Sequence, residues 1–214
     1  MTTESKTELK RGARERILST AYELFSRRGI RDVGIDEVIG RSRVAKATLY
    51  RHFPSKDDLV LAFLERREQL WTLGFVESRA RALGATPQDR LLAIFDVFDG
   101  WFRRPDEFDA CSFVNVLLEM GPAHPLGMAS IQYLSNIRTI VRALADEAGL
   151  RDTEAFAHSW HILMKGSIIA ASEGDRDAAL RAKDMARDLI TRFLPGPVRD
   201  DALEQATAER IAPK

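Results

Sequence analysis

Apolar residues recur at the spacing of an α-helix along almost the whole chain, and no segment alternates between apolar and polar residues as a half-buried strand does. The first clear stripe contains Ile17, Leu18, Ala21, Leu24 and Phe25. It predicts a helix from about Lys10 to Arg28, with Gly29 supplying a left-handed stop. The same periodicity continues downstream, and it favours an all-α fold.

Capping residues and helix breakers divide the rest of the chain into further helices. Two short ones are expected from about Ile35 to Arg41 and from about Ala45 to His52. Ser55 then precedes a long fourth helix to about Ala82, with Asp58 completing a shortened capping box. Thr86-Pro87 is typical of a helix start and opens a helix to about Arg103. Later helices are expected at about 109–120, 126–148, 153–173 and 175–194.

The charge of the chain is balanced as a whole but not along its length. The 32 basic and 32 acidic residues cancel, yet residues 1–60 hold thirteen basic and nine acidic ones. This asymmetry indicates that the N-terminal part alone contacts a polyanion. The single cysteine excludes an internal disulfide. Because there is no secretory signal and no apolar run near ~20 residues, we expect a cytoplasmic protein that does not enter a membrane.

The positive charge is concentrated in the second short helix and its flanks. Residues 38–56 contain no acidic side chain but five basic ones: Arg41, Arg43, Lys46, Arg51 and Lys56. A helical wheel predicts that Ala45, Leu49 and Phe53 face inward. The outward face then combines a small residue with cations, a hydroxyl and a phenol: Lys46, Ala47, Thr48, Tyr50 and Arg51.

Such a face fits the major groove of DNA, because it is narrow enough to approach base edges and carries donors for the phosphates on both sides. The alternative is an ordinary amphipathic helix with a solvated charged face. That alternative leaves the grouping of Thr, Tyr and Arg on one face unexplained. It also does not account for the short helix and the tight turn that come first, so DNA binding is the better interpretation.

A longer pattern surrounds these helices, from Gly29 to Leu59. It comprises Gly29, Val38, Ile39, Val44, Lys46, Thr48, Leu49, Tyr50, His52, Phe53, Ser55, Lys56 and Leu59. This pattern resembles the TetR family of bacterial transcriptional regulators. The resemblance implies that Lys46 and Ala47 meet base edges. It also implies that phosphates are held mostly by Thr48, Tyr50, Arg51, His52 and Lys56.

The chain departs from the family pattern at three positions. Gly34 stands where the family usually has Thr or Ser, Arg43 where it has Gly, and Ala45 where it has Ser. Ala45 offers the second helix no capping oxygen, a loss of about 1 kcal/mol. If Arg43 takes a left-handed conformation, that costs roughly another 1 kcal/mol. Our hypothesis is that Arg43 places a guanidinium at the mouth of the groove.

The remaining helices, by the same resemblance, form a larger domain for ligand binding and dimerisation. Residues 155–172 carry one charge, Lys165, and are otherwise apolar nearly all round, so their helix should be buried on two sides. A central helix of a monomeric bundle would fit the same pattern. A homodimer also fits DNA recognition, since two heads can read two half-sites. The expected dimer interface contains Trp160, Met164, Ile168, Met185, Leu189 and Phe193.

Bulky side chains are abundant in the middle of the chain. Taken singly, each is better interpreted as core, but as a group they could line an apolar cavity for a small-molecule effector. The candidates are Trp71, Phe75, Phe98, Trp101, Phe102, Phe113, Asn115, Tyr133, Trp160 and His161. His158 and His161 have a spacing that could bind metal, but no third ligand accompanies them. We therefore predict no metal site, and we predict no cofactor. Cys111 has no neighbouring cation to lower the pKa of its thiol, so we interpret it as an inert buried cysteine.

Together these features predict a ligand-responsive transcriptional regulator, most simply a repressor. It would bind a palindromic double-stranded DNA operator as a homodimer and be released by a small, largely apolar effector. The expected organisation is a mobile arm (1–9), a helix-turn-helix domain (10–55), a helical ligand-binding and dimerisation domain (56–195) and a tail (196–214). The alternative is an all-helical carrier or enzyme with no DNA role. We find no nucleophile-and-base set, phosphate-binding glycine loop or catalytic carboxylate pair, so no enzyme is predicted.

Overall fold

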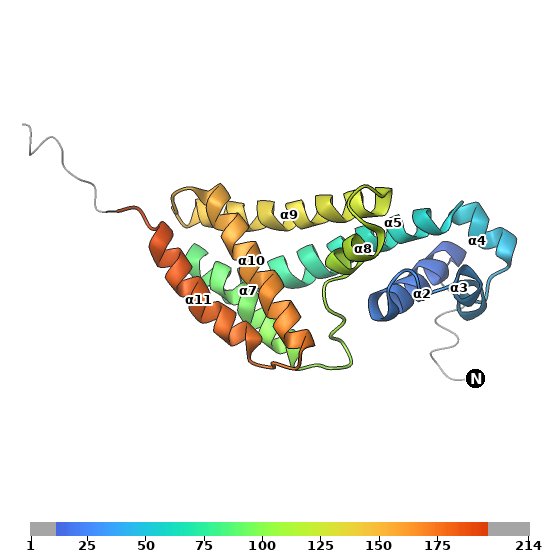
Figure 1. The fold of residues 1–214 in the computed structure, drawn as a ribbon, viewed down its shortest axis with the longest axis horizontal. Helices are drawn as coiled ribbons and strands as arrows, with labels where there is room; N and C mark the ends of the chain where they lie inside the picture. The colour runs from blue at the N-terminus through green and yellow to red at the C-terminus, as the bar shows by residue number, and fades with distance from the viewer. Residues whose placement is uncertain (1–11, 197–214) are drawn as a thin grey trace, which may run out of the picture.

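Every regular element in the part of the chain described by the computed structural model, residues 12–196, is a helix (Figure 1). In chain order these are α2 (Ala13–Arg28), α3 (Ile35–Ser42), α4 (Lys46–His52), α5 (Lys56–Arg67), η1 (Glu68–Glu77), α6 (Ser78–Leu83), α7 (Pro87–Phe102), α8 (Ser112–Met120), α9 (Pro125–Glu147), α10 (Thr153–Ser172) and α11 (Ala178–Phe193). The all-α prediction is confirmed. The predicted arm at 1–9 and the predicted tail beyond Gly196 lie outside the described residues. No described helix is both long and apolar enough to cross a membrane.

Helices α2, α3 and α4 form a small head at one end of the molecule (Figure 1). Its core contains the fully buried side chains of Ile17, Ala21, Val38 and Leu49, contributed by all three helices. Burying a large aliphatic side chain completely contributes about 1.5–3 kcal/mol. The seven-residue α4 is too short to be stable alone, so this packing is what holds it.

A single helical rod leads from the head into the body, and it comprises α5, η1 and α6. It begins with a complete capping box, in which the Ser55 Oγ accepts from the Asp58 N–H at 3.1 Å and the Ser55 N–H donates to Asp58 Oδ2 at 3.0 Å. The predicted fourth helix is therefore confirmed from its cap to within a residue of its predicted end at Ala82. The π-helical geometry of Glu68–Glu77 was not predicted.

The loop between α2 and α3 is anchored to the end of α8. The Glu119 carboxylate accepts from the backbone N–H groups of Ile30 at 2.9 Å and Arg31 at 3.0 Å. Gly29 makes room for this contact: it has a φ of 81°, and a Cβ there would lie 2.3 Å from Glu119 Oε1. The positive φ confirms the predicted left-handed stop, and a Cβ at this position would displace the Glu119 carboxylate from its contact with the loop.

A buried ion pair joins the rod to the loop before α8. The Arg67 guanidinium binds both oxygens of Asp109, at 2.8 and 3.0 Å, and donates to the Tyr22 hydroxyl of the head at 3.1 Å. The two charged side chains are only 5% and 12% exposed. The predicted helix start at 109 is wrong, because Asp109 is held by Arg67 and Ala110 takes a left-handed φ of 56° before α8 begins.

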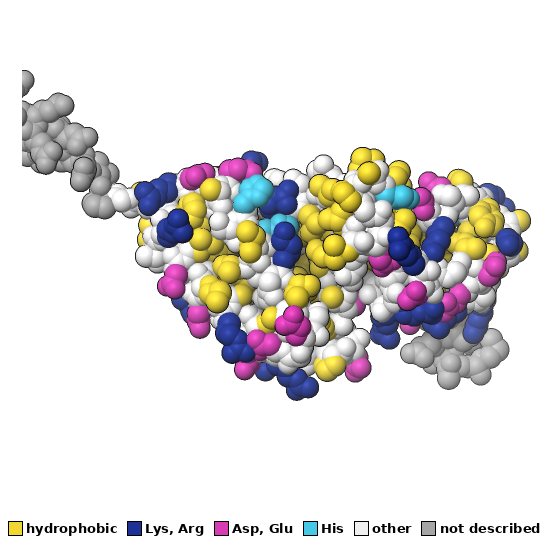
Figure 2. All heavy atoms as spheres, in the orientation of Figure 1, with side chains coloured by type: hydrophobic (Ala, Val, Ile, Leu, Met, Phe, Trp, Pro, Cys, Tyr) yellow, Lys and Arg dark blue, Asp and Glu magenta, His cyan; other side chains and the backbone are white. Residues whose placement is uncertain are grey.

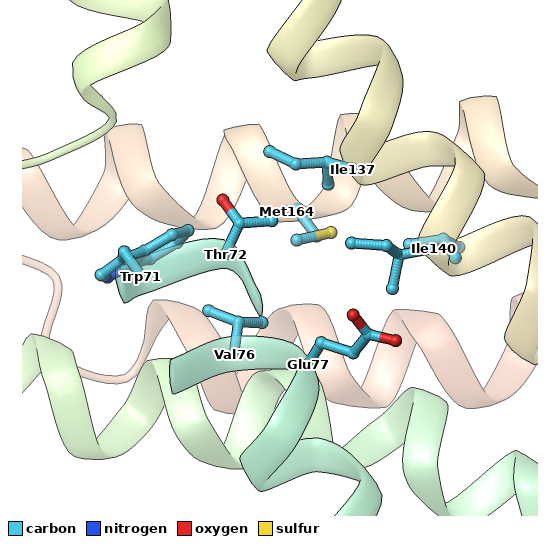
Figure 3. A pocket seen from close by; sticks show the side chains of 8 residues that line it. Trp71, Thr72, Val76, Glu77, Ile137, Ile140 and Met164 are labelled. Carbon is cyan, nitrogen blue, oxygen red and sulfur yellow. The ribbon is translucent and has the colours of Figure 1, made fainter. Parts of the chain in front are cut away.

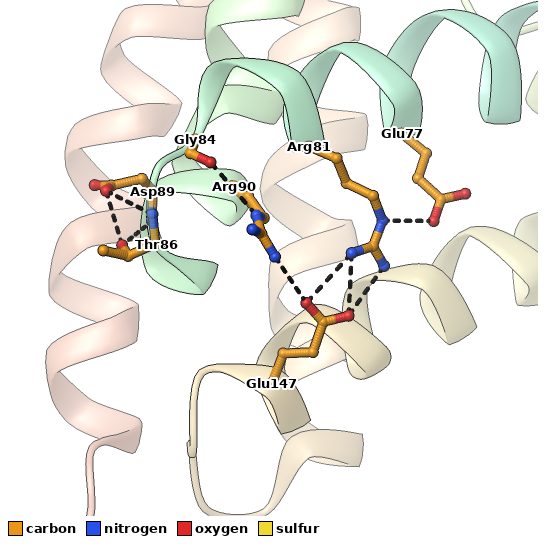
Figure 4. Close-up of polar contacts among 7 residues, drawn as sticks. All are labelled: Glu77, Arg81, Gly84, Thr86, Asp89, Arg90 and Glu147. Atoms are coloured by element: carbon orange, nitrogen blue, oxygen red, sulfur yellow. Dashed lines mark hydrogen bonds and ion pairs between the residues drawn. The ribbon is translucent and has the colours of Figure 1, made fainter.

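The body packs α7, α9, α10 and α11 beside the rod (Figure 1). As predicted, α7 starts with Thr86 as N-cap and Pro87 as its first residue, and Asp89 completes a capping box. At the far end of the rod, the Glu147 carboxylate of α9 accepts from Arg81 at 3.1 Å and from Arg90 at 3.2 Å (Figure 4). These contacts fix α6 against α7 and α9.

The last helices deviate slightly from the predicted bounds. Helices α9 and α10 agree with prediction to within a residue at each end. Helix α11 begins at Ala178 instead of residue 175, because Gly174 has a φ of 100° and Asp175 accepts from the Asp177 N–H at 3.0 Å in a turn. Asp175 is also paired with Arg181, so this turn is held by its own charges.

His161 is a buried titratable group in the core of the body. Burial, together with the charges of Lys165 and Arg138, lowers the pKa of His161 to about 3. Its Nδ1 has no hydrogen-bond partner among the described residues. The imidazole is therefore neutral in the folded protein throughout the physiological pH range, unlike an ordinary histidine of pKa about 6.5.

Replacement of Arg67 by Met should lower the free energy of unfolding by about 3–5 kcal/mol, because the Asp109 carboxylate would stay buried without its counter-charge. The double variant Arg67→Met/Asp109→Leu should recover much of this loss. Urea unfolding of the two single variants and the double variant measures the coupling. If the two single effects simply add in the double variant, the pair contributes no specific interaction.

Acidification should destabilise the protein through His161. The unfolded chain binds a proton below about pH 6.5, whereas the folded chain does not until about pH 3. The free energy of unfolding should therefore fall as the pH falls from about 6.5, by on the order of 2 kcal/mol at pH 5. His161→Phe should remove this component, and the exposed His158→Gln should retain it. Equal pH dependence of the wild type and His161→Phe would contradict the assignment.

Candidate functional site

Helices α3 and α4 form the predicted helix-turn-helix. Gly34 is the N-cap of α3 and makes no side-chain cap, and Asp36 and Glu37 lie in the positive first turn of the helix. Glu37 is paired with Arg28 at the end of α2, at 2.7 Å. The buried Ser42 closes α3 by donating its hydroxyl to the Val38 carbonyl at 2.6 Å. These contacts orient α3 beneath the second helix.

The turn between the two helices depends on Arg43. Its φ of 52° and ψ of 49° are left-handed, and its N–H donates to the Gly40 carbonyl at 3.4 Å. The predicted left-handed position is confirmed, so a residue with a Cβ stands here at a cost of about 1 kcal/mol. The arginine side chain is exposed beside the start of α4.

Ala45 is the N-cap of α4, in extended conformation and without a side-chain cap, as expected for alanine. Its predicted inward orientation is wrong: the residue is exposed, because it precedes the first helical residue and the helical wheel does not apply to it. Leu49 and Phe53 do face inward and are buried, as predicted. These two side chains pack α4 against the rest of the head, and the opposite face of α4 is exposed.

The predicted DNA-contact residues share one exposed surface, which we call the recognition face. Exposed on it are Arg43, Lys46, Ala47, Tyr50 and Arg51. Thr48, His52 and Lys56 are partly buried at its edges. Five of the eight predicted residues are thus exposed to a partner, and the role of all eight in binding DNA stays a prediction.

Two of the lysines already have partners in this structure. The Lys56 ammonium donates to the Ile30 carbonyl at 2.6 Å, which holds it at the start of α5 against the head. The Lys46 ammonium lies 3.4 Å from the Asp36 carboxylate, and both side chains are largely exposed. An exposed pair of this kind contributes about 0–1 kcal/mol, so it is easily exchanged for a phosphate.

Arg14 is a cation beside the recognition face that the sequence analysis missed. It belongs to α2, and its guanidinium lies 5.2 Å from the centre of the Phe53 ring. The side chain is otherwise exposed. No pattern in the sequence connects it to Phe53, because the two residues are far apart along the chain and meet only through the packing of α2 on α4.

A narrow cavity of about 20 Å³ lies in the body between η1, α9 and α10 (Figure 3). Its lining consists of Trp71, Thr72, Val76, Glu77, Ile137, Ile140, Val141 and Met164. Only Trp71 was among the predicted ligand-binding residues. The others are ordinary aliphatic or polar residues at helical spacing, and nothing distinguishes them in the sequence from the rest of the core.

The other predicted ligand-binding residues are distributed through the body. Phe98, Trp101, Phe102, Phe113 and Trp160 are buried in an aromatic core, where the rings of Trp71 and Trp101 lie 4.9 Å apart. Tyr133 stacks on Phe113 at 5.1 Å. Phe75 lies under the guanidinium of Arg79, and His161 is buried. Asn115 lines a second cavity of about 50 Å³ with Cys111 and Lys165, where burial raises the pKa of the cysteine thiol.

The predicted dimer interface needs a correction. Trp160, Met164 and Ile168 of α10 are buried in the core of the chain itself, so they offer no surface to a partner. The opposite side of α10 is the exposed apolar one, with Ile162 66% and Ile169 51% exposed. On α11 the residues Met185, Leu189 and Phe193 were also predicted; Met185 is exposed, and the other two are partly buried. The predicted α10 residues are therefore wrong, and dimerisation through α10 and α11 stays a prediction.

Comparison with known proteins agrees with this geometry. Residues 17–63, which cover the head and the start of α5, match the model of the family described as bacterial regulatory proteins, tetR family. The chain is 36% identical over 85 residues to the transcriptional repressor KstR of Mycobacterium tuberculosis, and 45% identical over 53 residues to the transcriptional activator FasR of Mycolicibacterium smegmatis. These stretches span 40% and 25% of this chain, and 38% and 24% of the two relatives.

Solved structures extend the likeness to the body. A TetR-family transcriptional regulator from Streptomyces coelicolor superposes with a TM-score of 0.76 at 28% identity, covering 86% of this chain and 96% of the other. The reduced form of NemR from Escherichia coli shares the fold, with a TM-score of 0.73 at 19% identity over 83% of this chain and 97% of that one. The head therefore matches the tetR family of bacterial regulatory proteins, and the fold of head and body together is similar to that of a solved TetR-family regulator.

Proposed function

We propose that the protein is a transcriptional regulator that binds double-stranded DNA through the recognition face of α4. The observation that carries this proposal is the exposure of Arg43, Lys46, Tyr50 and Arg51 on one surface of a rigid head. No acidic side chain occurs from Val38 to Lys56 to oppose a phosphate. Such a surface supplies both the electrostatic attraction and the donors that a DNA groove requires.

The residues of the recognition face divide into two roles. Lys46 and the small Ala47, in the first turn of α4, are positioned to approach base edges in the major groove. Thr48, Tyr50, Arg51 and His52 flank them and would hold phosphates, together with Lys56 at the N-terminus of α5, where the helix dipole also favours an anion. This assignment follows the resemblance residue by residue and fits the observed exposures.

We further propose that two copies bind a palindromic operator. The outer side of α10 carries Ile162, Gly166 and Ile169 at intervals of four and three residues, and Met185 of α11 is exposed nearby. Apolar side chains reach the surface over these helices (Figure 2). An apolar stripe on two neighbouring helices is suited to pairing with its own copy about a twofold axis. Two heads then double the number of base contacts.

The cavity beside Trp71 is the proposed effector site, and its apolar lining favours a largely apolar small molecule. Binding would shift the molecule to a form whose two heads no longer match the half-sites, so the protein would act as a repressor released by its effector. An almost complete switch needs about 5.5 kcal/mol of differential affinity, which two sites could share. KstR is named a repressor and FasR an activator, so similarity of the head alone does not determine whether a regulator represses or activates transcription.

DNA affinity should fall steeply with salt. For six to ten phosphate contacts, the loss is roughly 10³–10⁵-fold between about 50 and 200 mM salt. A gel-shift series with duplexes from the DNA flanking the protein's own coding region measures the slope. Arg51→Gln should reduce the slope by about one for each bound head. Arg176→Gln, which removes the same charge from the body, should leave it unchanged, and a flat response of the wild type would favour a carrier without a DNA role.

Replacing Arg43 by Gly should raise the free energy of unfolding by about 1 kcal/mol, because glycine adopts the left-handed conformation without strain. The same change should weaken DNA binding, since the guanidinium is lost. Arg43→Ala is the matched control: it loses the guanidinium but keeps the strained Cβ, so it should bind DNA as weakly without the gain in stability. Thermal unfolding and gel shifts at matched salt measure both effects. Wild-type affinity in either variant would exclude a DNA contact by Arg43.

A further inference from the structure

The π-helical segment Glu68–Glu77 is the least ordinary backbone in the molecule. At its end, the Ser78 N–H is shared between the Leu73 carbonyl, five residues back, and the Phe75 carbonyl, three residues back, where an α-helix would bond four residues back. π-helices account for well under 1% of residues and mostly occur as single turns, often at functional sites. A π-helical segment of ten residues, in the rod that connects head and body, is therefore unusual enough to indicate a functional role.

Gly74 is a residue that fits this geometry. A Cβ at this position would lie 2.9 Å from the Gln69 backbone carbonyl oxygen, which belongs to the residue five positions earlier. The obstacle is backbone, so it cannot swing aside. In an α-helix the same substitution would be favourable, because alanine is the best helix former and glycine is one of the poorest. Gly74 thus permits the π register, and an alanine there would oppose it.

The two ends of the segment are fixed to different parts of the molecule. Arg67, directly before it, binds Tyr22 of the head and Asp109 of the loop before α8. Glu77, its last residue, accepts from Arg81 at 3.1 Å, and Arg81 in turn holds Glu147 of α9 (Figure 4). Since each N–H that moves from the i−5 to the i−4 carbonyl winds the helix more tightly, a change of register turns the head end relative to the body end.

The same segment forms one wall of the cavity, through Trp71, Thr72, Val76 and Glu77 (Figure 3). At about 20 Å³ the cavity has room for roughly one water, so any larger occupant must displace a wall. The buried Trp71 Nε1 and Thr72 Oγ1 have no hydrogen-bond partner among the described residues. Moving this wall therefore breaks no side-chain hydrogen bond at either atom.

We propose that Glu68–Glu77 is a hydrogen-bond register switch. The π register seen here is the one that binds DNA, and an apolar occupant of the cavity pushes the wall toward the α register, which turns α5 and the head away from their operator geometry. The inference rests on the proposed function and adds to it the element that carries the signal. In this proposal the segment Glu68–Glu77, which contains Gly74, links occupation of the cavity to the position of the head.

The test compares Gly74→Ala with Gly100→Ala. Gly100 lies in α7, and a Cβ there meets no atom within 4 Å, so this control makes the same chemical change without the conflict. With the tightest duplex selected from a random pool of about 30 base pairs, Gly74→Ala should bind at least ~10-fold more weakly than the wild type, and Gly100→Ala within about twofold. Wild-type affinity in folded Gly74→Ala would overturn the proposal.

A readout without DNA separates this proposal from the proposed function. The chain has three tryptophans, and after labelling with 5-fluorotryptophan the resonance of Trp71 can be assigned with Trp71→Phe. Gly74→Ala should shift the fluorine resonance of Trp71 more than that of Trp160, and Gly100→Ala should shift neither. An unmoved Trp71 resonance would overturn the register switch. A moved resonance in a protein that binds no duplex would support the switch and remove only the DNA-binding function.

If Gly74→Ala fails to fold, amide hydrogen exchange of the wild type decides the matter. Binding of the selected duplex should change exchange in Glu68–Glu77 more than in α9. Equal changes in the two helices, or none in the segment, would overturn the proposal.

Discussion

The buried pair of Arg67 and Asp109 is the interaction on which the arrangement of the molecule depends. A bidentate pair so little exposed is stable only when its remaining donors are also satisfied, and here Tyr22 accepts one of them. One guanidinium thus joins the head, the rod and the loop before α8. Because removing Arg67 or Asp109 would leave the other charge buried without a partner, this pair ties the head to the rod and to the loop before α8.

This constraint explains why the recognition face can be built from so few residues. The short α4 owes its position to Leu49 and Phe53, and the head owes its position to Glu119, which binds the loop after Gly29. A surface held this rigidly loses little conformational freedom when it binds. The strained Arg43 fits the same logic, since backbone strain is tolerated where the surrounding structure determines the conformation.

Sequence reasoning succeeded where local chemistry decides the structure. Ser55 and Thr86 predicted their helix starts because a capping oxygen acts within three residues, and Leu49 and Phe53 followed from the helical period. It failed where distant contacts decide: Asp109 is withdrawn from α8 by an arginine 42 residues away. The π register of η1 leaves no periodic signal, and Ile137 and Ile140 resemble any core residue. Trp160 was placed on the wrong face because its helix is apolar nearly all round, so periodicity could not distinguish inside from outside.

The position of the head at one end of an elongated molecule gives the balanced charge a further meaning. Among the described residues, 12–60 hold ten basic and seven acidic side chains and 61–196 hold sixteen and nineteen, so positive charge gathers at the head and negative charge in the body. At distances beyond about 10 Å in physiological salt such a molecule is hardly attracted to DNA. Close to a duplex, the phosphates would attract the basic head and repel the acidic body. The separation of charge along the molecule would thus set the orientation in which the protein meets DNA and would not raise the association rate. It would also weaken non-specific binding of the body to DNA.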